Sequence, residues 1–219
     1  MKMYFVKINF LFFLFILFLC GEIVFASLPL SGKNIIIDVG HGGLDPGSIY
    51  KDIYEKDINL AISLELEKEL SKLGASVELV RYGDYDLSKP NAYMRKKSDF
   101  DNRIKIINES KADYYFSIHL NYLEDKRYYG PQIFYNTKTK NNKIIAKQIQ
   151  KDLNKKLKTN REVKKIPNKT YMYDKLLVDG VLIECGFLSN SYERNLLVSK
   201  EYQKKFAKIL ANSIGNLKL

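Results

Sequence analysis

The sequence predicts a single α/β domain built around a central, mostly parallel twisted sheet with helices on both faces. Short apolar runs alternate with longer amphipathic stretches along the 219-residue chain, which is typical of successive βαβ units. The chain after residue 26 has no internal repeat, low-complexity linker or change of composition. We therefore expect one domain over residues 27–219.

The order of the expected elements follows from the spacing of apolar residues. Residues 34–39 are apolar on both faces, as in a central parallel strand. Further strands are expected at 75–80, 114–119, 132–135 and 181–185. Helices are expected at 55–73, 99–110, 141–157 and 199–216, where apolar residues recur at helical spacing. Residues 81–97 are expected to form a loop, and residues 161–179 fit no single element.

Residues 1–26 have the pattern of a secretory signal peptide. Lys2 and Lys7 form a basic start, residues 10–19 are an unbroken apolar run, and Ala26 supplies a small residue at the cleavage position. We therefore expect export to the cell envelope and cleavage after Ala26. The alternative is an uncleaved anchor, although the apolar core is shorter than the roughly 20 residues of a membrane span. Membrane contact is expected only through this segment, if it is retained.

The net charge and the cysteine content limit which partners the protein can bind and whether it can form a disulfide bond. The net charge of +11 favours polyanions such as wall polymers, acidic lipids or nucleic acid, and export makes nucleic acid the least favoured of these. We expect no nucleic-acid partner. Cleavage would leave Cys185 as the single cysteine, which excludes an intrachain disulfide.

Three expected strands carry a polar residue near or just beyond their carboxyl ends: His41, His119 and Glu184. In open α/β sheets this edge is where ligands bind, because the loops diverge there and leave a crevice. His41 lies in a glycine-rich stretch that forces an irregular path. Glu184 interrupts an apolar run, so a cation, a hydrogen-bonding partner or a raised pKa must compensate its carboxylate.

Two histidines at one sheet edge favour a zinc site. Catalytic zinc takes three protein ligands and keeps a fourth position open, so one more ligand is needed. Glu55, at the start of the first expected helix, is well placed because the loop from His41 is short. Spacing alone leaves three competing oxygen ligands on that loop, Asp45, Asp52 and Asp57.

Four separated motifs together resemble one enzyme family. They are IIIDVGHGGLDPG, the glutamate that begins the following helix, DNRIKIINESKADYYFSIHLN and GVLIECGFLSNSYE. In this order they closely resemble the zinc-dependent N-acetylmuramoyl-L-alanine amidases of the third amidase family, and the likeness spans roughly residues 33–217. A short exported chain with these motifs is most similar to the germination-specific, spore-cortex amidases of endospore formers.

The resemblance implies a zinc ion held by His41, Glu55 and His119, and a catalytic carboxylate at Glu184. It implies hydrolysis of the amide between the lactyl group of N-acetylmuramic acid and L-alanine of the peptidoglycan stem peptide. It also implies a role in cortex maturation, through muramic δ-lactam formation, on the cortex side of the forespore membranes. Glu184 would take a proton from the attacking water and return it to the alanine nitrogen.

Three further residues have candidate roles around the site. Asp38 is a candidate partner that orients an imidazole from behind. Arg95 and Arg103 are candidates for contact with the acidic stem peptide, against a surface or helix-capping role. Two other functions remain open at this point: a zinc peptidase that cuts within the stem peptide, and a non-catalytic module that binds peptidoglycan or a partner. An accessory envelope protein is also a candidate partner.

Overall fold

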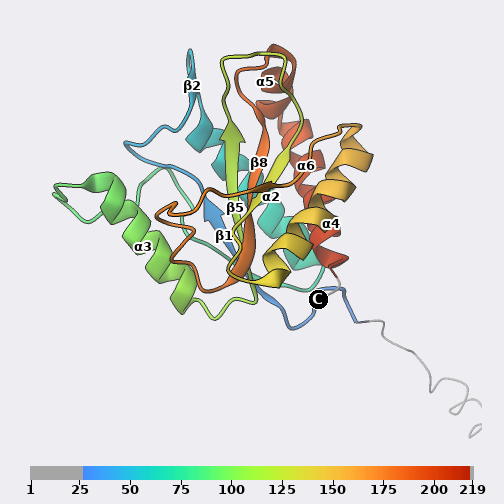
Figure 1. Cartoon of the computed structure of the whole chain (residues 1–219), viewed down its shortest axis with the longest axis horizontal. Coiled ribbons are helices and arrows are strands. Elements are labelled where there is room, and N and C mark those ends of the chain that lie inside the picture. The colour runs from blue at the N-terminus through green and yellow to red at the C-terminus, as the bar shows by residue number, and fades with distance from the viewer. Residues whose placement is uncertain (1–26, 218–219) are drawn as a thin grey trace, which may run out of the picture.

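A six-stranded sheet lies at the centre of residues 27–217, which this computed structural model describes (Figure 1). Across the sheet the strands are β4 (Ser76–Leu79), β1 (Asn34–Val39), β5 (Tyr114–Asn121), β8 (Asp179–Phe187), β6 (Gln132–Tyr135) and β7 (Lys164–Lys165). The expected signal peptide lies outside the described residues. Within the described part, no helix combines the length and apolar character needed to cross a membrane.

The sheet is mostly parallel, as predicted. β1 pairs in parallel with β4 and β5, and β5 pairs in parallel with β8. The exception is β6, which runs antiparallel to β8 and carries β7 at the edge. Because β1, β5 and β8 point the same way, their carboxyl ends meet at one edge of the sheet.

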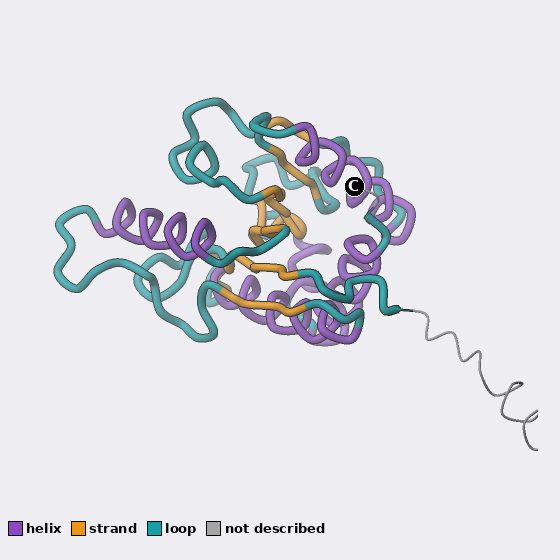
Figure 2. Tube along the Cα trace, turned by 90° about the horizontal axis from the view of Figure 1, so that it is seen from below, coloured by secondary structure: helices purple, strands orange, loops and turns teal. Residues whose placement is uncertain are grey.

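Helices cover both faces of the sheet, which confirms the predicted class. α2 (Glu55–Lys72), α4 (Lys140–Leu157) and α6 (Lys200–Gly215) form the layer on one face. α3 (Arg95–Glu109) lies on the opposite face, and Figure 2 shows the strands between the two groups. The first layer buries apolar side chains against the sheet, as the periodicity of its helices predicts.

Several elements differ from the sequence-based expectation. α3 begins at Arg95 rather than 99, because the polar first turn, where Ser98 N donates to Met94 O, carries no apolar signal. β5 and β8 each extend beyond the expected strand. A short hairpin of β2 (Ile49–Tyr50) and β3 (Ile53–Tyr54), the strand β7 and the helix α5 (Ser191–Leu197) were not predicted, since each is too short to show a period.

Candidate active site

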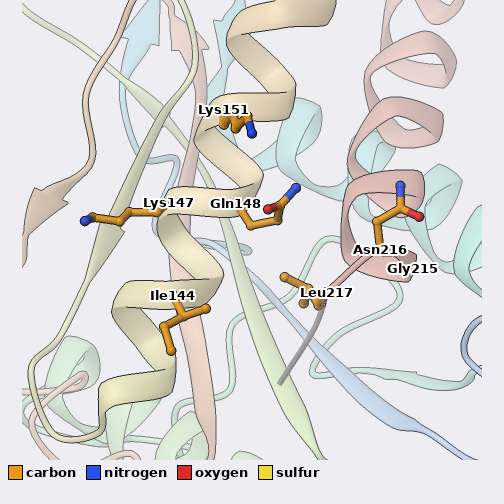
Figure 3. A pocket seen from close by; sticks show the side chains of 7 residues that line it. All are labelled: Ile144, Lys147, Gln148, Lys151, Gly215, Asn216 and Leu217. Atoms are coloured by element: carbon orange, nitrogen blue, oxygen red, sulfur yellow. The ribbon is translucent and has the colours of Figure 1, made fainter.

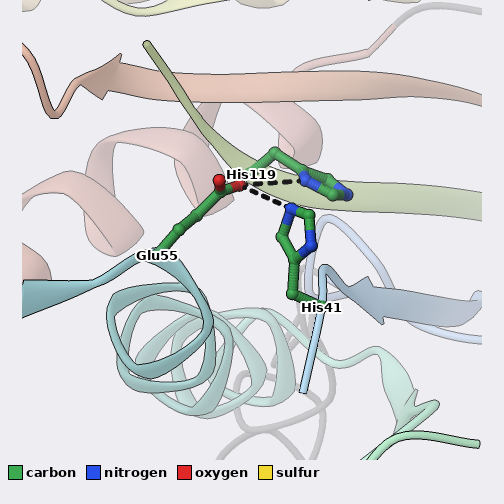
Figure 4. Close-up of side chains that lie close together, drawn as sticks. All are labelled: His41, Glu55 and His119. Carbon is green, nitrogen blue, oxygen red and sulfur yellow. Dashed lines mark hydrogen bonds and ion pairs between the residues drawn. The ribbon is translucent and has the colours of Figure 1, made fainter. Parts of the chain in front are cut away.

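Three of the predicted ligands meet at the carboxyl edge of the sheet. His41 follows β1, His119 lies on β5, and Glu55 is the first residue of α2. Glu55 Oε1 lies 3.1 Å from His41 Nε2 and 3.1 Å from His119 Nδ1 (Figure 4). One potential metal-binding atom from each of these residues lies within 4.8 Å of the other two. Among the described residues, these three side chains form the group that could hold a metal ion.

The Glu55 carboxylate is held in place by the protein backbone. It is buried, and its two oxygens accept hydrogen bonds from the backbone N–H groups of Leu120 and Ser48 at 3.0 and 2.8 Å. The short hairpin of β2 and β3 returns the chain to the sheet edge and delivers this residue there. A carboxylate held in this way needs little reorganisation to bind a cation.

The glycine-rich loop between β1 and α2 shapes the pocket around these side chains. A Cβ atom on Gly47, whose φ is +67°, would lie 2.7 Å from both Glu55 Oε2 and His41 Cδ2. A Cβ atom on Gly40 would clash with the imidazole ring of His119. His41 itself has a φ of 60°, a left-handed conformation that costs free energy in a non-glycine residue and is held by its surroundings.

Asp45 orients His41 rather than competing with Glu55 for the same position. Its Oδ2 accepts a hydrogen bond from His41 Nδ1 at 2.9 Å, which leaves His41 Nε2 facing Glu55. The other two competing oxygens, on Asp52 and Asp57, belong to exposed residues that are not part of the group. A carboxylate behind a ligating imidazole typically fixes the ring's tautomer and orientation.

The electrostatics of the group favour opposite charges on its members. Burial disfavours a charged His41, but hydrogen bonds to Asp45 and Glu55 outweigh it and raise the pKa of His41 to about 9. Burial also opposes a charged Glu55, but the hydrogen bonds from His119 and His41 lower the pKa of Glu55 far below its usual value. The buried carboxylate of Glu55 is therefore stabilised by its hydrogen bonds with both histidines.

Glu184 faces a cavity of about 240 Å³ that it shares with His41 and His119. It lies opposite His119 in the pairing of β5 with β8. Its Oε2 is shielded from solvent and has no hydrogen-bond partner among the described residues. This burial raises the pKa of Glu184 to about 7. A carboxyl with a pKa near neutrality can both accept and release a proton during a reaction.

Arg103 and Asp38 line the same cavity and form a buried ion pair, and contact of Arg103 with the stem peptide stays a prediction. Arg103 is 2% exposed and pairs with Asp38 and Asp99 at 2.7 Å. It also donates to the carbonyl oxygens of Val39 and His41, so it holds the strained backbone of His41. Asp38 accepts from Arg103 and Ser117 and makes no hydrogen bond to an imidazole in the described chain. The imidazole contact expected of Asp38 is made by Asp45.

Removing the Arg103 charge should destabilise the fold strongly. In Arg103→Met, Asp38 and Asp99 would remain as buried carboxylates without their partner, so the free energy of unfolding should fall by about 3–5 kcal/mol. Urea denaturation followed by circular dichroism measures this change. The matched control is Arg127→Met, whose exposed pair with Asp125 should leave stability unchanged. Equal stability of Arg103→Met and wild type would contradict the role of Arg103.

Arg95 lies on a second hollow beside the cavity. Its guanidinium is half-exposed and pairs with Asp86. This hollow, of about 280 Å³, shares Asp45 and Asp99 with the cavity that contains Glu184. The location of Arg95 is compatible with contact to substrate, and this contact stays a prediction.

The wall of the cavity includes residues that sequence reasoning missed. Thr170, Tyr171, Met172 and Tyr173 line it, and they come from the segment without a clear pattern. The Tyr173 hydroxyl lies 3.1 Å from Ser117 Oγ, and the Tyr171 hydroxyl contacts Asp101 on α3 at 2.5 Å. The concentration of tyrosine and methionine in this segment is the one signal that could have suggested a cavity wall.

Residues 35–216 match the sequence profile of a family described as N-acetylmuramoyl-L-alanine amidase. The chain belongs to this amidase family. The match covers every residue of the group formed by His41, Glu55, His119 and Glu184. The sequence-based resemblance is thereby confirmed, and the protein is an N-acetylmuramoyl-L-alanine amidase.

Individual relatives agree with the assignment of this amidase. A germination-specific N-acetylmuramoyl-L-alanine amidase of Bacillus subtilis (strain 168) is 40% identical over 192 residues, which cover 86% of this chain and 81% of the relative. The CwlD amidase from Clostridioides difficile, solved in complex with the GerS lipoprotein, matches with a TM-score of 0.78 and 40% identity over 84% of this chain and 96% of that one. An N-acetylmuramoyl-L-alanine amidase from Clostridium difficile 630 matches with a TM-score of 0.73 and 28% identity over 83% and 94%. Such relatives indicate action on peptidoglycan in the cell envelope.

Proposed function

We propose that this amidase is a zinc hydrolase whose metal is held by His41, Glu55 and His119. The chemistry of the donor set supports zinc, since two imidazoles and one carboxylate are a ligand set that catalytic zinc sites use. The observation that carries the proposal is that these donors lie within 4.8 Å of one another, and that two of them, His41 and His119, line a cavity that also contains Glu184. When bound there, zinc would act as a Lewis acid on the scissile carbonyl and make water acidic enough to attack near neutral pH.

Glu184 is the proton carrier of this scheme. Its carboxylate takes a proton from the attacking water as the new carbon–oxygen bond forms. It then returns that proton to the alanine nitrogen as the carbon–nitrogen bond breaks, so that a neutral amine leaves. The buried position of Glu184 supports this role, because its raised pKa makes both transfers accessible near neutrality.

The bond cleaved in this scheme joins the lactyl group of N-acetylmuramic acid to L-alanine of the stem peptide. The opening of about 240 Å³ suits the lactyl group and the first residue of the peptide rather than a whole glycan chain. The half-exposed guanidinium of Arg95, on the adjoining hollow, would face the acidic part of the stem.

The biological setting that we infer is the spore cortex. The relative named as germination-specific supports this setting, because the two sequences align over most of both chains at 40% identity. Removal of the stem peptide exposes the lactyl carboxyl of muramic acid, which is the group that must close on the sugar to form muramic δ-lactam. Export through residues 1–26 would place the enzyme on the cortex side of the forespore membranes.

An accessory envelope protein is part of the proposal. The CwlD amidase, to which this chain is 40% identical, is described in complex with a lipoprotein. We propose that a lipoprotein of the same kind binds this amidase at the membrane.

Digestion of purified peptidoglycan tests the proposed reaction. Mass spectrometry should detect free stem peptides that begin with L-alanine, together with glycan strands that keep an intact lactyl group. A chelator should abolish their release, and added zinc should restore it, because the scheme needs the metal. Fragments cut within the stem would show a peptidase instead, and release that persists after complete metal removal would contradict the zinc proposal.

A further inference from the structure

Helix α4 carries an unbalanced row of positive charge. Its sequence, KNNKIIAKQIQKDLNKKL, contains six lysines and one acidic residue. These exposed lysines form what we call the α4 lysine face: Lys140, Lys143, Lys147, Lys151, Lys155 and Lys156. Four of them recur at every fourth position, from Lys143 to Lys155, so they lie on one side of the helix. Like charges at this spacing destabilise a helix. The stability of the fold therefore does not explain why these lysines are placed in a row.

Lysine abundance across the chain does not account for this arrangement. In α2, Lys68 pairs with Glu65 and Lys72 pairs with Glu69, so that lysines are balanced along that helix. None of the lysines of the α4 lysine face forms an ion pair within residues 27–217. The acidic residue of α4, Asp152, instead accepts hydrogen bonds from Gln148 and Ser213. The positive charge of the face is therefore not compensated within the described residues.

A groove runs beside this face, between α4 and the end of α6. It has a volume of about 720 Å³, and Figure 3 shows Gln148 from α4 and Leu217 from the C-terminal segment pointing into it. Its lining is formed by Ile144, Lys147, Gln148, Lys151, Gly215, Asn216 and Leu217. Amide groups, two lysines, the exposed side chain of Ile144 and the half-buried side chain of Leu217 therefore line one surface. This combination suits the boundary between lipid headgroups and acyl chains.

The described chain begins next to this groove. Pro29 lies against Gly215, where a Cβ atom added to Gly215 would be 3.5 Å from Pro29 Cβ. Pro29 follows the apolar run of residues 10–19 by ten positions in the sequence. An export signal is threaded and cleaved at a bilayer. With residues 1–26 as the proposed export signal, the chain that follows them would leave the bilayer beside the α4 lysine face.

We propose that the α4 lysine face binds the acidic headgroups of a phospholipid bilayer, with one headgroup in the groove beside Lys147 and Lys151. Charge complementarity and the position of the chain entry both point to this partner. Membrane contact would then not depend on residues 1–26 alone, which goes beyond the expectation from sequence.

This docking leaves the active site free. The catalytic cavity is lined by Phe100 and Arg103 of α3, on the face of the sheet opposite α4. A bilayer against α4 would hold the amidase at the membrane while the cavity opens towards the wall. Because the lysine face contains no catalytic residue, its role is separable from the reaction.

Lysine acetylation of the full chain tests the proposal. The protein is reconstituted into vesicles of phosphatidylcholine with or without phosphatidylglycerol, and acetylation by a water-soluble ester is followed by peptide mass spectrometry. Phosphatidylglycerol should slow the acetylation of Lys147 and Lys151 severalfold, and high salt should reverse the protection. Exposed lysines elsewhere, Lys105 and Lys126, are internal controls whose rates should not change.

Variants sharpen this test. In Lys147→Gln/Lys151→Gln, phosphatidylglycerol should protect Lys143 and Lys155 much less, because two headgroup contacts are lost. The matched variant Lys105→Gln/Lys126→Gln should keep the full protection. Equal acetylation rates with and without phosphatidylglycerol would overturn the proposal. It would also be overturned if a soluble poly(glycerol phosphate) protected the face while phosphatidylglycerol vesicles did not, since the partner would then be a wall polymer.

Discussion

Glu184→Gln should bind zinc like the wild type and release stem peptide about 10² to 10⁴ times more slowly. The amide of glutamine keeps the size of the side chain, so the cavity and the three nearby ligands stay in place. It cannot accept the proton of the attacking water or return one to the alanine nitrogen. The collapse should therefore appear in kcat, as measured by the release of L-alanyl peptides from purified peptidoglycan. Zinc content by elemental analysis should stay at one per chain.

A matched variant separates the catalytic role of Glu184 from a general effect of charge. Glu109→Gln removes one carboxylate at the exposed end of α3 and should leave the rate unchanged. Glu184→Gln should also be at least as stable as the wild type, because the shielded Oε2 of Glu184 has no hydrogen-bond partner among the described residues. A near-normal rate in Glu184→Gln would assign the base to another residue.

The main helices of this amidase were predictable from their apolar period, and the main strands from their short apolar runs. The apolar strands β1, β5 and β8 set the common edge, and their carboxyl ends carry His41, His119 and Glu184. The convergence of these residues follows from parallel pairing alone. The choice of Glu55 over the nearby aspartates did not follow from spacing. It came from the family resemblance.

The supporting contacts could not be predicted, because they depend on packing between segments far apart in sequence. Arg103 reaches Asp38 and the carbonyl of His41 across more than 60 positions. Asp45 contacts His41, and His41 adopts a left-handed φ that no pattern in the sequence specifies. The cavity wall around Tyr171 and Tyr173 is irregular, so no period marks it. Sequence patterns thus predict the ligand-bearing elements better than the contacts that hold them.

His119→Ala should lose zinc and, with it, the amidase activity. The change removes one of three donors and leaves Glu55 and His41 as a two-residue site, which is too few for tight zinc binding. Elemental analysis after dialysis should find zinc well below one per chain, and His41→Ala should behave alike. Circular dichroism should show that both variants remain folded, since each histidine is only partly buried at the cavity. Full retention of zinc would remove these histidines from the ligand set.

Two aspartate variants distinguish a ligand from a residue that orients one. Asp45→Asn should keep zinc but weaken its binding about 10- to 100-fold in competition with a chelator, because His41 loses the carboxylate that fixes its ring. Asp52→Asn lies on the exposed turn between β2 and β3, and should bind zinc like the wild type. If Asp45→Asn instead lost zinc as completely as His119→Ala, Asp45 would have to be counted among the ligands. The geometry of the site therefore predicts that the loss of zinc affinity is largest for His119→Ala, intermediate for Asp45→Asn and absent for Asp52→Asn.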